Sequence, residues 1–193
     1  MVQSRRSKAL SIVGVAALAL LAVVPSSASA RPDRSGHWGV RAILRDADGA
    51  YVGTVRLAPR HGSVVVTGRF KDLTPGFHGF HLHAVGRCEP PFTSAGGHHN
   101  PSGVEHGQHD GDLPPLLVQQ DGTAVTVTES DRFDVAELLD ADGTAIVVHA
   151  GADNLGNIPD RYVSTETGQA GPDSDTAATG DAGDRVACGV LSG

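Results

Sequence analysis

Residues 78–88 read HGFHLHAVGRC, a stretch that predicts a β-strand with His81 and His83 two positions apart. Side chains at i and i+2 of a strand point to the same face, roughly 6.6 Å apart along it. Two imidazoles at this spacing can converge on one metal ion, while the apolar residues of opposite parity would face a core. A lone strand histidine is usually a surface or core-edge residue. Here, however, seven of the chain's ten histidines fall within residues 78–109, which favours a metal site.

Short alternating segments bounded by turn residues surround this stretch and predict an all-β domain. Eight strands are expected, over residues 37–45, 51–57, 63–70, 78–86, 113–120, 123–128, 144–150 and 185–191. The sequences DADG at 46–49 and DG at 121–122 are typical of hairpin turns. Residues 135–139 could form one helical turn, and no other segment has a helical pattern. Eight short strands with regular turns indicate one antiparallel sandwich or barrel.

Two long irregular segments, residues 87–112 and 151–184, interrupt the strands. Loops longer than ~15 residues in a compact domain are usually functional or disordered, and a bound metal would order the first one. That loop carries His98, His106, His109 and Asp112, spaced His-x7-His-x2-His-x2-Asp. Three imidazoles and one carboxylate suit a closed tetrahedral zinc site.

A second metal set combines residues from three segments. His149 ends the predicted strand 144–150 and could join His81, His83 and His98. Four nitrogen ligands suit Cu(II). His98 would then belong to both sets, as an imidazolate that bridges copper and zinc.

The first thirty residues have the pattern of a secretory signal peptide. Three basic residues precede an apolar run over 9–24, and the small residues Ala28-Ser29-Ala30 form a cleavage site. The alternative is an uncleaved anchor, but the run is shorter than the ~18 residues that a membrane span needs. We therefore expect a mature domain over residues 31–193, secreted or held in the cell envelope without stable membrane insertion.

The charge of the mature chain limits its partners. Without the three basic residues of the signal, 12 basic and 22 acidic residues remain, a net charge of −10. Such a chain has no general basic field for nucleic acid or an anionic membrane. Its two cysteines suggest one disulfide, as is usual in exported proteins.

Several motifs are similar to those of the exported bacterial copper–zinc superoxide dismutases. They read HGFHLH (78–83), GHHNP (97–101), HG (106–107), GDL (111–113), IVVHAGADNLG (146–156) and GDAGDRVACGVL (180–191). They follow the family order over nearly the whole mature chain. The resemblance implies an eight-stranded Greek-key β-barrel or sandwich with two long functional loops, in a monomer or homodimer.

The resemblance also implies a role for individual residues. The implied copper ligands are His81, His83, His98 and His149, and the implied zinc ligands are His98, His106, His109 and Asp112. Asp153 would link His81 to His106, and Arg185 would guide the anionic substrate. Cys88 and Cys188 would form a disulfide. His78 is expected to be a hydrogen-bonded core residue and His99 to pack. His37 and His61 match no site and should be solvated.

The implied reaction is a copper redox cycle with superoxide as substrate. One superoxide is oxidised to dioxygen; His98 leaves copper and takes a proton; a second superoxide is then reduced and protonated to hydrogen peroxide. Two departures from the family pattern stand out. The segment between His106 and His109 is short, which puts the zinc geometry in question. Loop 151–184 also lacks the lysines that many relatives use for steering; Arg161 or another arginine could replace them, or steering is weaker.

Two other functions compete with this one. A copper carrier or storage protein on the same scaffold also needs metal ligands, but not Arg185 or a bridging imidazole. A zinc-only structural or adhesion domain would not need the four copper-site histidines.

Overall fold

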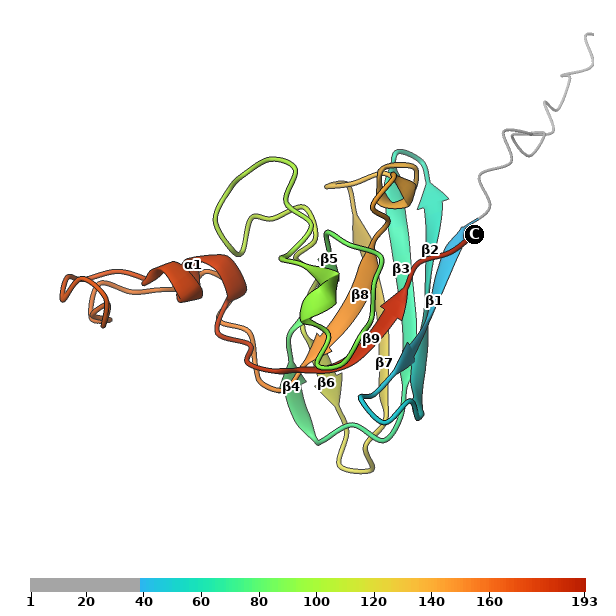
Figure 1. Ribbon diagram of the computed structural model, residues 1–193, viewed down its shortest axis with the longest axis horizontal. Helices are drawn as coiled ribbons and strands as arrows, with labels where there is room; N and C mark the ends of the chain where they lie inside the picture. Colours follow the sequence, from blue (N-terminus) through green and yellow to red (C-terminus); the bar gives the residue numbers. More distant parts are fainter. Residues whose placement is uncertain (1–38) are drawn as a thin grey trace, which may run out of the picture. The chain divides into compact units, whose positions relative to one another are not determined.

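The computed structural model describes residues 39–193, so the signal peptide expected over 1–30 and His37 lie outside the described residues. Nine strands form two antiparallel sheets (Figure 1). The strands are β1 (Val40–Arg45), β2 (Tyr51–Arg60), β3 (Ser63–Phe70), β4 (Gly76–His78), β5 (Phe80–His83), β6 (Leu116–Val118), β7 (Ala124–Ser130), β8 (Ala145–His149) and β9 (Arg185–Val190). No helix within residues 39–193 is long and apolar enough to span a membrane.

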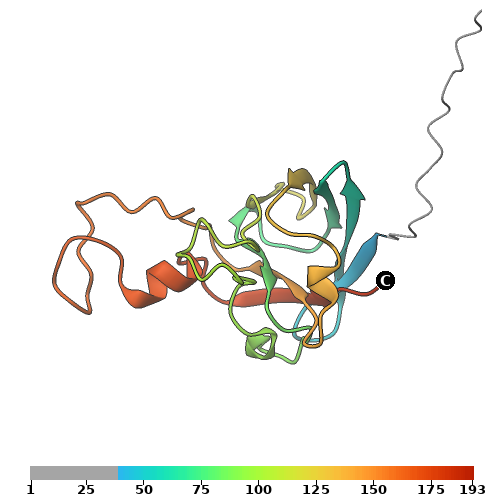
Figure 2. The ribbon, with the colours of Figure 1, turned by 90° about the horizontal axis from the view of Figure 1, so that it is seen from above.

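The larger sheet has the order β5-β8-β9-β1-β2-β3-β7, and β4 pairs with β6 in the smaller one. The last strand, β9, thus lies beside the first, and the chain passes from β3 near one edge to β5 at the other. This crossover is the Greek-key connection, and Figure 2 shows the strands curling around a core. The all-β antiparallel fold predicted from the sequence is confirmed.

The strand predicted over 78–86 is wrong in its bounds, because Gly79 divides it. A Cβ at Gly79 would lie 2.6 Å from the Ala182 side chain, and the Gly79 backbone bonds to Gly151 in the second long loop and to His149 at the end of β8. His78 therefore ends β4 and pairs with Leu116 of β6. His81 and His83 lie on β5 in the other sheet.

Three short helices lie between the strands. The turn expected within 135–139 is present as the 3-10 helix η2 (Glu137–Leu139), but the 3-10 helix η1 (Thr93–Ala95) and α1 (Ser174–Thr179) were not predicted. Helix α1 is capped at its start by the Asp173 side chain, which accepts from the Thr176 N–H, and ends at Gly180 with φ +66°. Its six residues are too few to show a helical period in the sequence.

Both predicted turns form. The Asp46 carboxylate accepts the N–H groups of Asp48 and Ala50, and Gly49 takes φ +82° between β1 and β2. Gly122, with φ +81°, turns the chain between β6 and β7. These two strands belong to different sheets, so the second turn is not a simple hairpin.

Alternating apolar residues of β1, β2 and β3 fill the main core, where Phe70 and Phe80 pack edge to face with ring centroids 5.7 Å apart. All five residues of β8 are buried, because the strand lies between its neighbours with both faces covered. Cys88 and Cys188 form the predicted disulfide, with Cα atoms 5.6 Å apart. The disulfide joins loop 87–112 to β9 and packs in a smaller apolar cluster.

Candidate metal centre

Strand β5 presents His81 and His83 beside the first long loop. The Leu82 N–H donates to Gly111 O at 2.9 Å, and the His99 N–H donates to Leu82 O at 2.8 Å. The loop thus runs along the edge of β5, opposite the edge that pairs with β8. This pairing brings His98 next to His83 and Asp112 next to His81.

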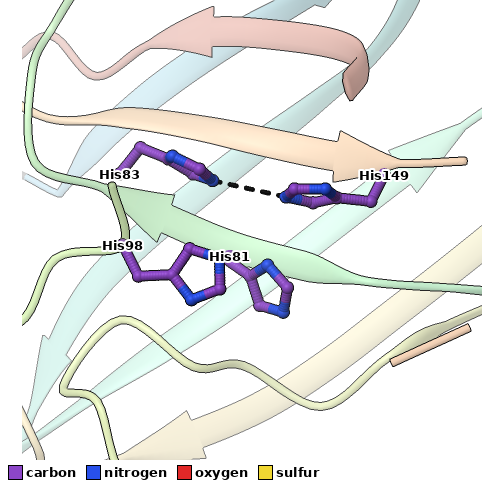
Figure 3. A group of neighbouring side chains, drawn as sticks. All are labelled: His81, His83, His98 and His149. Carbon is purple, nitrogen blue, oxygen red and sulfur yellow. Dashed lines mark hydrogen bonds between the residues drawn. The ribbon is translucent and has the colours of Figure 1, made fainter. Parts of the chain in front are cut away.

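Four imidazoles converge at this edge, as Figure 3 shows. His81, His83, His98 and His149 each offer a ring nitrogen, and these atoms lie within 4.8 Å of one another. The Nε2 atoms of His83 and His149 are 3.4 Å apart, and the rings of His81 and His98 have centroids 4.1 Å apart. We call this group the four-histidine cluster.

The remaining ring nitrogens of this cluster are fixed by hydrogen bonds. His83 Nδ1 donates to Gly96 O at 3.0 Å, and His149 Nδ1 donates to Gly183 O at 2.9 Å. Their Nε2 lone pairs are thereby directed at one another. His81 bonds through Nε2 to Asp153 at 2.5 Å, and its buried Nδ1 has no hydrogen-bond partner among the described residues. An unpartnered buried nitrogen facing other lone pairs is the arrangement a metal ion would satisfy.

A second group lies on the other side of His98. Its Nδ1 is 3.1 Å from His109 Nδ1 and 3.0 Å from Asp112 Oδ1. The same carboxylate oxygen is 3.2 Å from His109 Nδ1 and 3.4 Å from His106 Nδ1, and the His106 atom is another buried nitrogen without a hydrogen-bond partner. Three imidazoles and a carboxylate around one point suit zinc. We call this group the histidine–aspartate cluster.

The short segment between His106 and His109 does not prevent this geometry. Asp112 Oδ2 accepts the N–H groups of Gly107 at 2.7 Å and His109 at 3.0 Å. Gly107 has φ +88°, a conformation that a side chain would strain. Asp112 therefore holds the loop backbone through Oδ2, while its Oδ1 faces the three imidazoles.

Arg132 also holds this loop, and no pattern in the sequence identifies it. Its Nη1 donates to His109 O at 3.1 Å and to Gly107 O at 3.4 Å. Arg132 follows β7 in a polar segment far along the chain from the histidines. A lone arginine in such a segment has no recognisable spacing, so only the tertiary contact identifies it.

Asp153 links the two clusters, as the resemblance implied. Its carboxylate bonds to His81 Nε2 and, at 2.7 Å, to His106 Nε2. Gly180, at the end of α1, lies directly over this pair: a Cβ there would be 2.1 Å from His106 Nε2 and 2.7 Å from Asp153 Oδ1. The second long loop thus docks on the metal ligands through a position that admits only glycine.

Burial and neighbouring charges shift the pKa values of the buried histidines in opposite directions. Burial lowers the pKa of His81, lowers that of His83 well below its ordinary value and lowers that of His149 to about 3. Burial opposes the charged form of His106 as well, but the neighbouring carboxylates of Asp112 and Asp153 favour it and raise its pKa to about 9. His81, His83 and His149 therefore offer neutral imidazoles, which are the form that binds metals.

Arg185 lies beside the four-histidine cluster at the start of β9. Its guanidinium donates to Phe92 O and Gly96 O, both at 2.7 Å. Gly96 O also accepts from His83 Nδ1, so Arg185 and His83 share one carbonyl. Arg185 is also paired with His149 in the β8–β9 register.

The other histidines within residues 39–193 lie outside both clusters. His78 is buried, and its ring nitrogens lie 2.6 Å from His149 O and 2.7 Å from Thr74 O, which confirms a hydrogen-bonded core residue. His61 is exposed in the β2–β3 turn. His99 is half-buried and packs against Gly111. Arg161 lies over the Tyr162 ring, and its steering role stays a prediction.

Known proteins share this sequence and fold. Residues 51–191 match the family model of copper/zinc superoxide dismutase (SODC). The chain is 44% identical to a superoxide dismutase [Cu-Zn] of Mycobacterium bovis, with 86% of this chain and 76% of that one covered. It is 36% identical to the protein of that name from Photobacterium leiognathi, over 74% and 80% of the two chains.

Solved structures agree with the sequence relatives. An SOD-like protein from Bacillus subtilis, crystallised as a double mutant, is 29% identical with a TM-score of 0.63, over 79% of this chain and 97% of that one. The clock protein EA4 is 27% identical with the same TM-score, over 79% and 92% of the two chains. The family match spans every strand from β2 to β9 and all the residues of both clusters, and the chain belongs to the copper/zinc superoxide dismutase family.

Proposed function

We infer that this protein dismutates superoxide to dioxygen and hydrogen peroxide, with copper and zinc as cofactors. The observation that carries this function is the position of His98, which is shared by two groups of ligands. Its Nδ1 belongs to the histidine–aspartate cluster, which leaves Nε2 for the four-histidine cluster. A single metal site would not need a shared imidazole.

We propose copper for the four-histidine cluster, held by His81, His83, His98 and His149, and zinc for the histidine–aspartate cluster. The all-nitrogen set suits Cu(II), and the three imidazoles with Asp112 suit zinc. When bound, copper supplies the one-electron oxidation and reduction that the reaction requires. The two unpartnered nitrogens, His81 Nδ1 and His106 Nδ1, support one metal in each cluster.

The chain supplies proton handling and anion binding. His98 Nε2 can hold a proton while Nδ1 stays in the histidine–aspartate cluster, so the ring keeps its place through a turnover. The His83 and His149 rings are held through Nδ1 by Gly96 O and Gly183 O. Arg185 has N–H groups left after its two bonds to carbonyls, and these can attract and orient an anion beside the cluster.

A copper carrier is not favoured by this geometry. Release of copper would be helped by mobile ligands, whereas Asp153 and the two carbonyls fix these imidazoles in the buried interior. A carrier would also have no need of Arg185 next to the ligands.

Superoxide consumption by the copper- and zinc-loaded protein tests the function. We expect rapid consumption that cyanide, a copper ligand, abolishes, and none after His83→Ala. The variant His61→Ala, which removes an exposed histidine outside both clusters, is the matched control. Full copper loading without superoxide consumption would contradict the dismutase function and favour a carrier.

We further propose that the protein is exported, with residues 1–30 as a cleaved signal, and acts as a monomer or homodimer outside the cytoplasm. The basic start, apolar run and small-residue site of the sequence support this location. Mass spectrometry of the intact protein from the culture fluid or the cell envelope should give a chain that begins at or near Arg31. A mass that includes residues 1–30 would contradict cleavage.

A further inference from the structure

The charges of this protein are distributed very unevenly along the chain. Residues 72–193 contain 19 acidic and four basic residues, whereas residues 39–71 contain six basic and two acidic residues. The second segment forms β1, β2 and β3, which lie side by side in the larger sheet (Figure 1). A strongly acidic protein thus carries a local excess of positive charge on three neighbouring strands.

Three arginines form a strip across the outer face of these strands. Arg41 on β1, Arg56 on β2 and Arg69 on β3 are exposed and alternate with buried residues. Arg41 pairs directly with Arg56, and Arg69 is the diagonal neighbour of Arg56 through the β2–β3 register. Directly opposed residues are about 5 Å apart and diagonal ones about 7–8 Å. We call Arg41, Arg56 and Arg69 the arginine strip.

None of the three arginines of the strip forms an ion pair within residues 39–193, whereas three other basic side chains there do. Arg60 pairs with Glu129 at 3.5 Å, Lys71 with Asp72 at 2.6 Å and Arg87 with Glu89 at 3.8 Å. Like charges directly opposite one another destabilise a sheet. The Arg41–Arg56 pair therefore has a cost in stability that an anionic ligand would remove.

A hollow of about 320 Å³ lies beside the strip on the same face. Its lining consists of Thr54, Arg56, Thr67, Gly68, Arg69, Val125, Thr126 and Val127. Hydroxyl and guanidinium groups there can donate hydrogen bonds, and the exposed side chains of Val125 and Val127 form an apolar wall. Guanidinium groups bind phosphate oxygens bidentately, and arginine is better suited to this than lysine.

We propose that the arginine strip binds a linear phosphodiester polymer. A thin chain of phosphates can follow the strip while staying away from the acidic remainder of the molecule. An extended anionic surface, such as a membrane or an acidic protein, would also face the acidic remainder of the molecule, because residues 72–193 contain 19 acidic and only four basic residues. Charges within the ~8 Å Debye length interact strongly at physiological salt, so those residues would repel the larger surface.

Binding of fluorescent poly(glycerol phosphate) to the full metal-loaded protein tests this site. The triple variant Arg41→Gln/Arg56→Gln/Arg69→Gln should lose at least about tenfold in affinity and show a weaker salt dependence, because fewer phosphate contacts release fewer counterions. The matched control is Arg60→Gln/Lys71→Gln/Arg87→Gln, which removes the same charge from paired residues. It should change the affinity less than about twofold. Both variants should consume superoxide at the wild-type rate.

The single variant Arg56→Gln guards against a folding artefact. It should weaken binding several-fold while raising the melting temperature slightly, since it removes the like-charged neighbour of Arg41. The proposal is overturned if the wild type does not bind the polymer, or if the control triple loses as much affinity as the strip triple. Equal binding of polyglutamate would overturn the phosphate assignment. Stronger binding to phosphatidylglycerol vesicles would identify a membrane surface instead.

Discussion

Asp112 shows how much one residue contributes at this site. One carboxylate oxygen faces three imidazole nitrogens, and the other accepts two backbone N–H groups of the loop. Burial disfavours its charged form, but the close imidazoles of His106 and His98 hold its pKa well below the usual range. The carboxylate is therefore charged at any pH at which the enzyme works, and the loop depends on it even without zinc.

The two metals should respond separately to single substitutions. His83→Ala removes a ligand of the four-histidine cluster alone, so we expect loss of copper and of turnover with zinc retained. Asp112→Asn should lower zinc content first and reduce the melting temperature, with a smaller loss of activity. Metal analysis by mass spectrometry distinguishes the two results. Loss of both metals in both variants would contradict independent sites.

Arg185 should control the approach of the substrate. Superoxide is an anion, the chain without the proposed signal carries a net charge of −10, and only charges within about 8 Å of copper act strongly at physiological salt. Local focusing of this kind can raise an association rate roughly 10- to 1000-fold. Arg185→Ala should therefore lower the second-order rate at least several-fold with copper content unchanged, and Arg185→Glu should lower it further.

Stopped-flow rates at several ionic strengths check this prediction. The wild-type rate should fall as salt rises, and the fall should be weaker in Arg185→Ala. Arg60→Gln, which changes a β2 residue outside both clusters, is the control for a general change of charge. A wild-type rate and salt dependence in Arg185→Glu would show that this residue does not guide the substrate.

Among the structural elements, the two long loops supply the residues of the metal centre that the strands do not. Loop 87–112 contributes His98, and it is fixed by β5 on one side and by the disulfide to β9 on the other. Loop 151–184 contributes Asp153 and places α1 on the histidine–aspartate cluster, where Ala177 O accepts the His106 N–H at 2.9 Å. Each loop is ordered by contacts with the other, so the ligands form one cooperative unit.

Arg132 is the external support of the shortened loop. Arg132→Gln removes the donor that Gly107 O and His109 O share. We expect roughly tenfold weaker zinc binding, in the range seen when outer contacts of metal ligands are lost, with copper affinity unchanged. Competition with a zinc chelator measures this, and Arg161→Gln, an exposed arginine of the other loop, is the control. Equal zinc affinity in the two variants would leave Arg132 without a role in the site.

For the molecule as a whole, the buried histidines link stability to pH in the metal-free protein. The lowered pKa values of His81, His83 and His149 mean that the unfolded chain binds more protons below about pH 6.5. Stability is therefore lost as the pH falls below that value. The raised pKa of His106, about 9, acts in the opposite direction: its contribution is complete below about pH 6.5 and is lost as the pH rises towards 9.

The metal-free protein should therefore be most stable near pH 6.5–7. Thermal unfolding measured from pH 4.5 to 9 tests this, since the stability contributed by the depressed carboxylates Asp112 and Asp153 is present above their ordinary pKa of about 4 and is lost only as the pH falls below it. In His149→Gln, the melting temperature should fall less steeply as the pH is lowered, because a buried imidazole that stays neutral in the folded protein has been removed. A melting temperature that stays constant between pH 6.5 and 4.5 would contradict the burial of neutral histidines.

The sequence by itself determined the strands, the turns and the inventory of ligands, because each depends on local pattern. Alternating apolar residues, Asp-Gly turns and the spacing of His81 and His83 are properties of neighbouring residues. The division of one predicted strand at Gly79 was not visible, since it depends on the close approach of Ala182. The short helix α1 was missed because its six residues carry no period.

Only the tertiary structure decided which ligands meet and what holds them. His98 reaches both clusters because loop 87–112 runs antiparallel to β5, a pairing that no local spacing encodes. Arg132 and Gly180 reach this centre from distant segments. Arg132 donates to the His109 carbonyl, and Gly180 approaches His106 closely because it has no side chain. The arginine strip likewise depends on strand register, because residues far apart in sequence become neighbours only when the sheet forms.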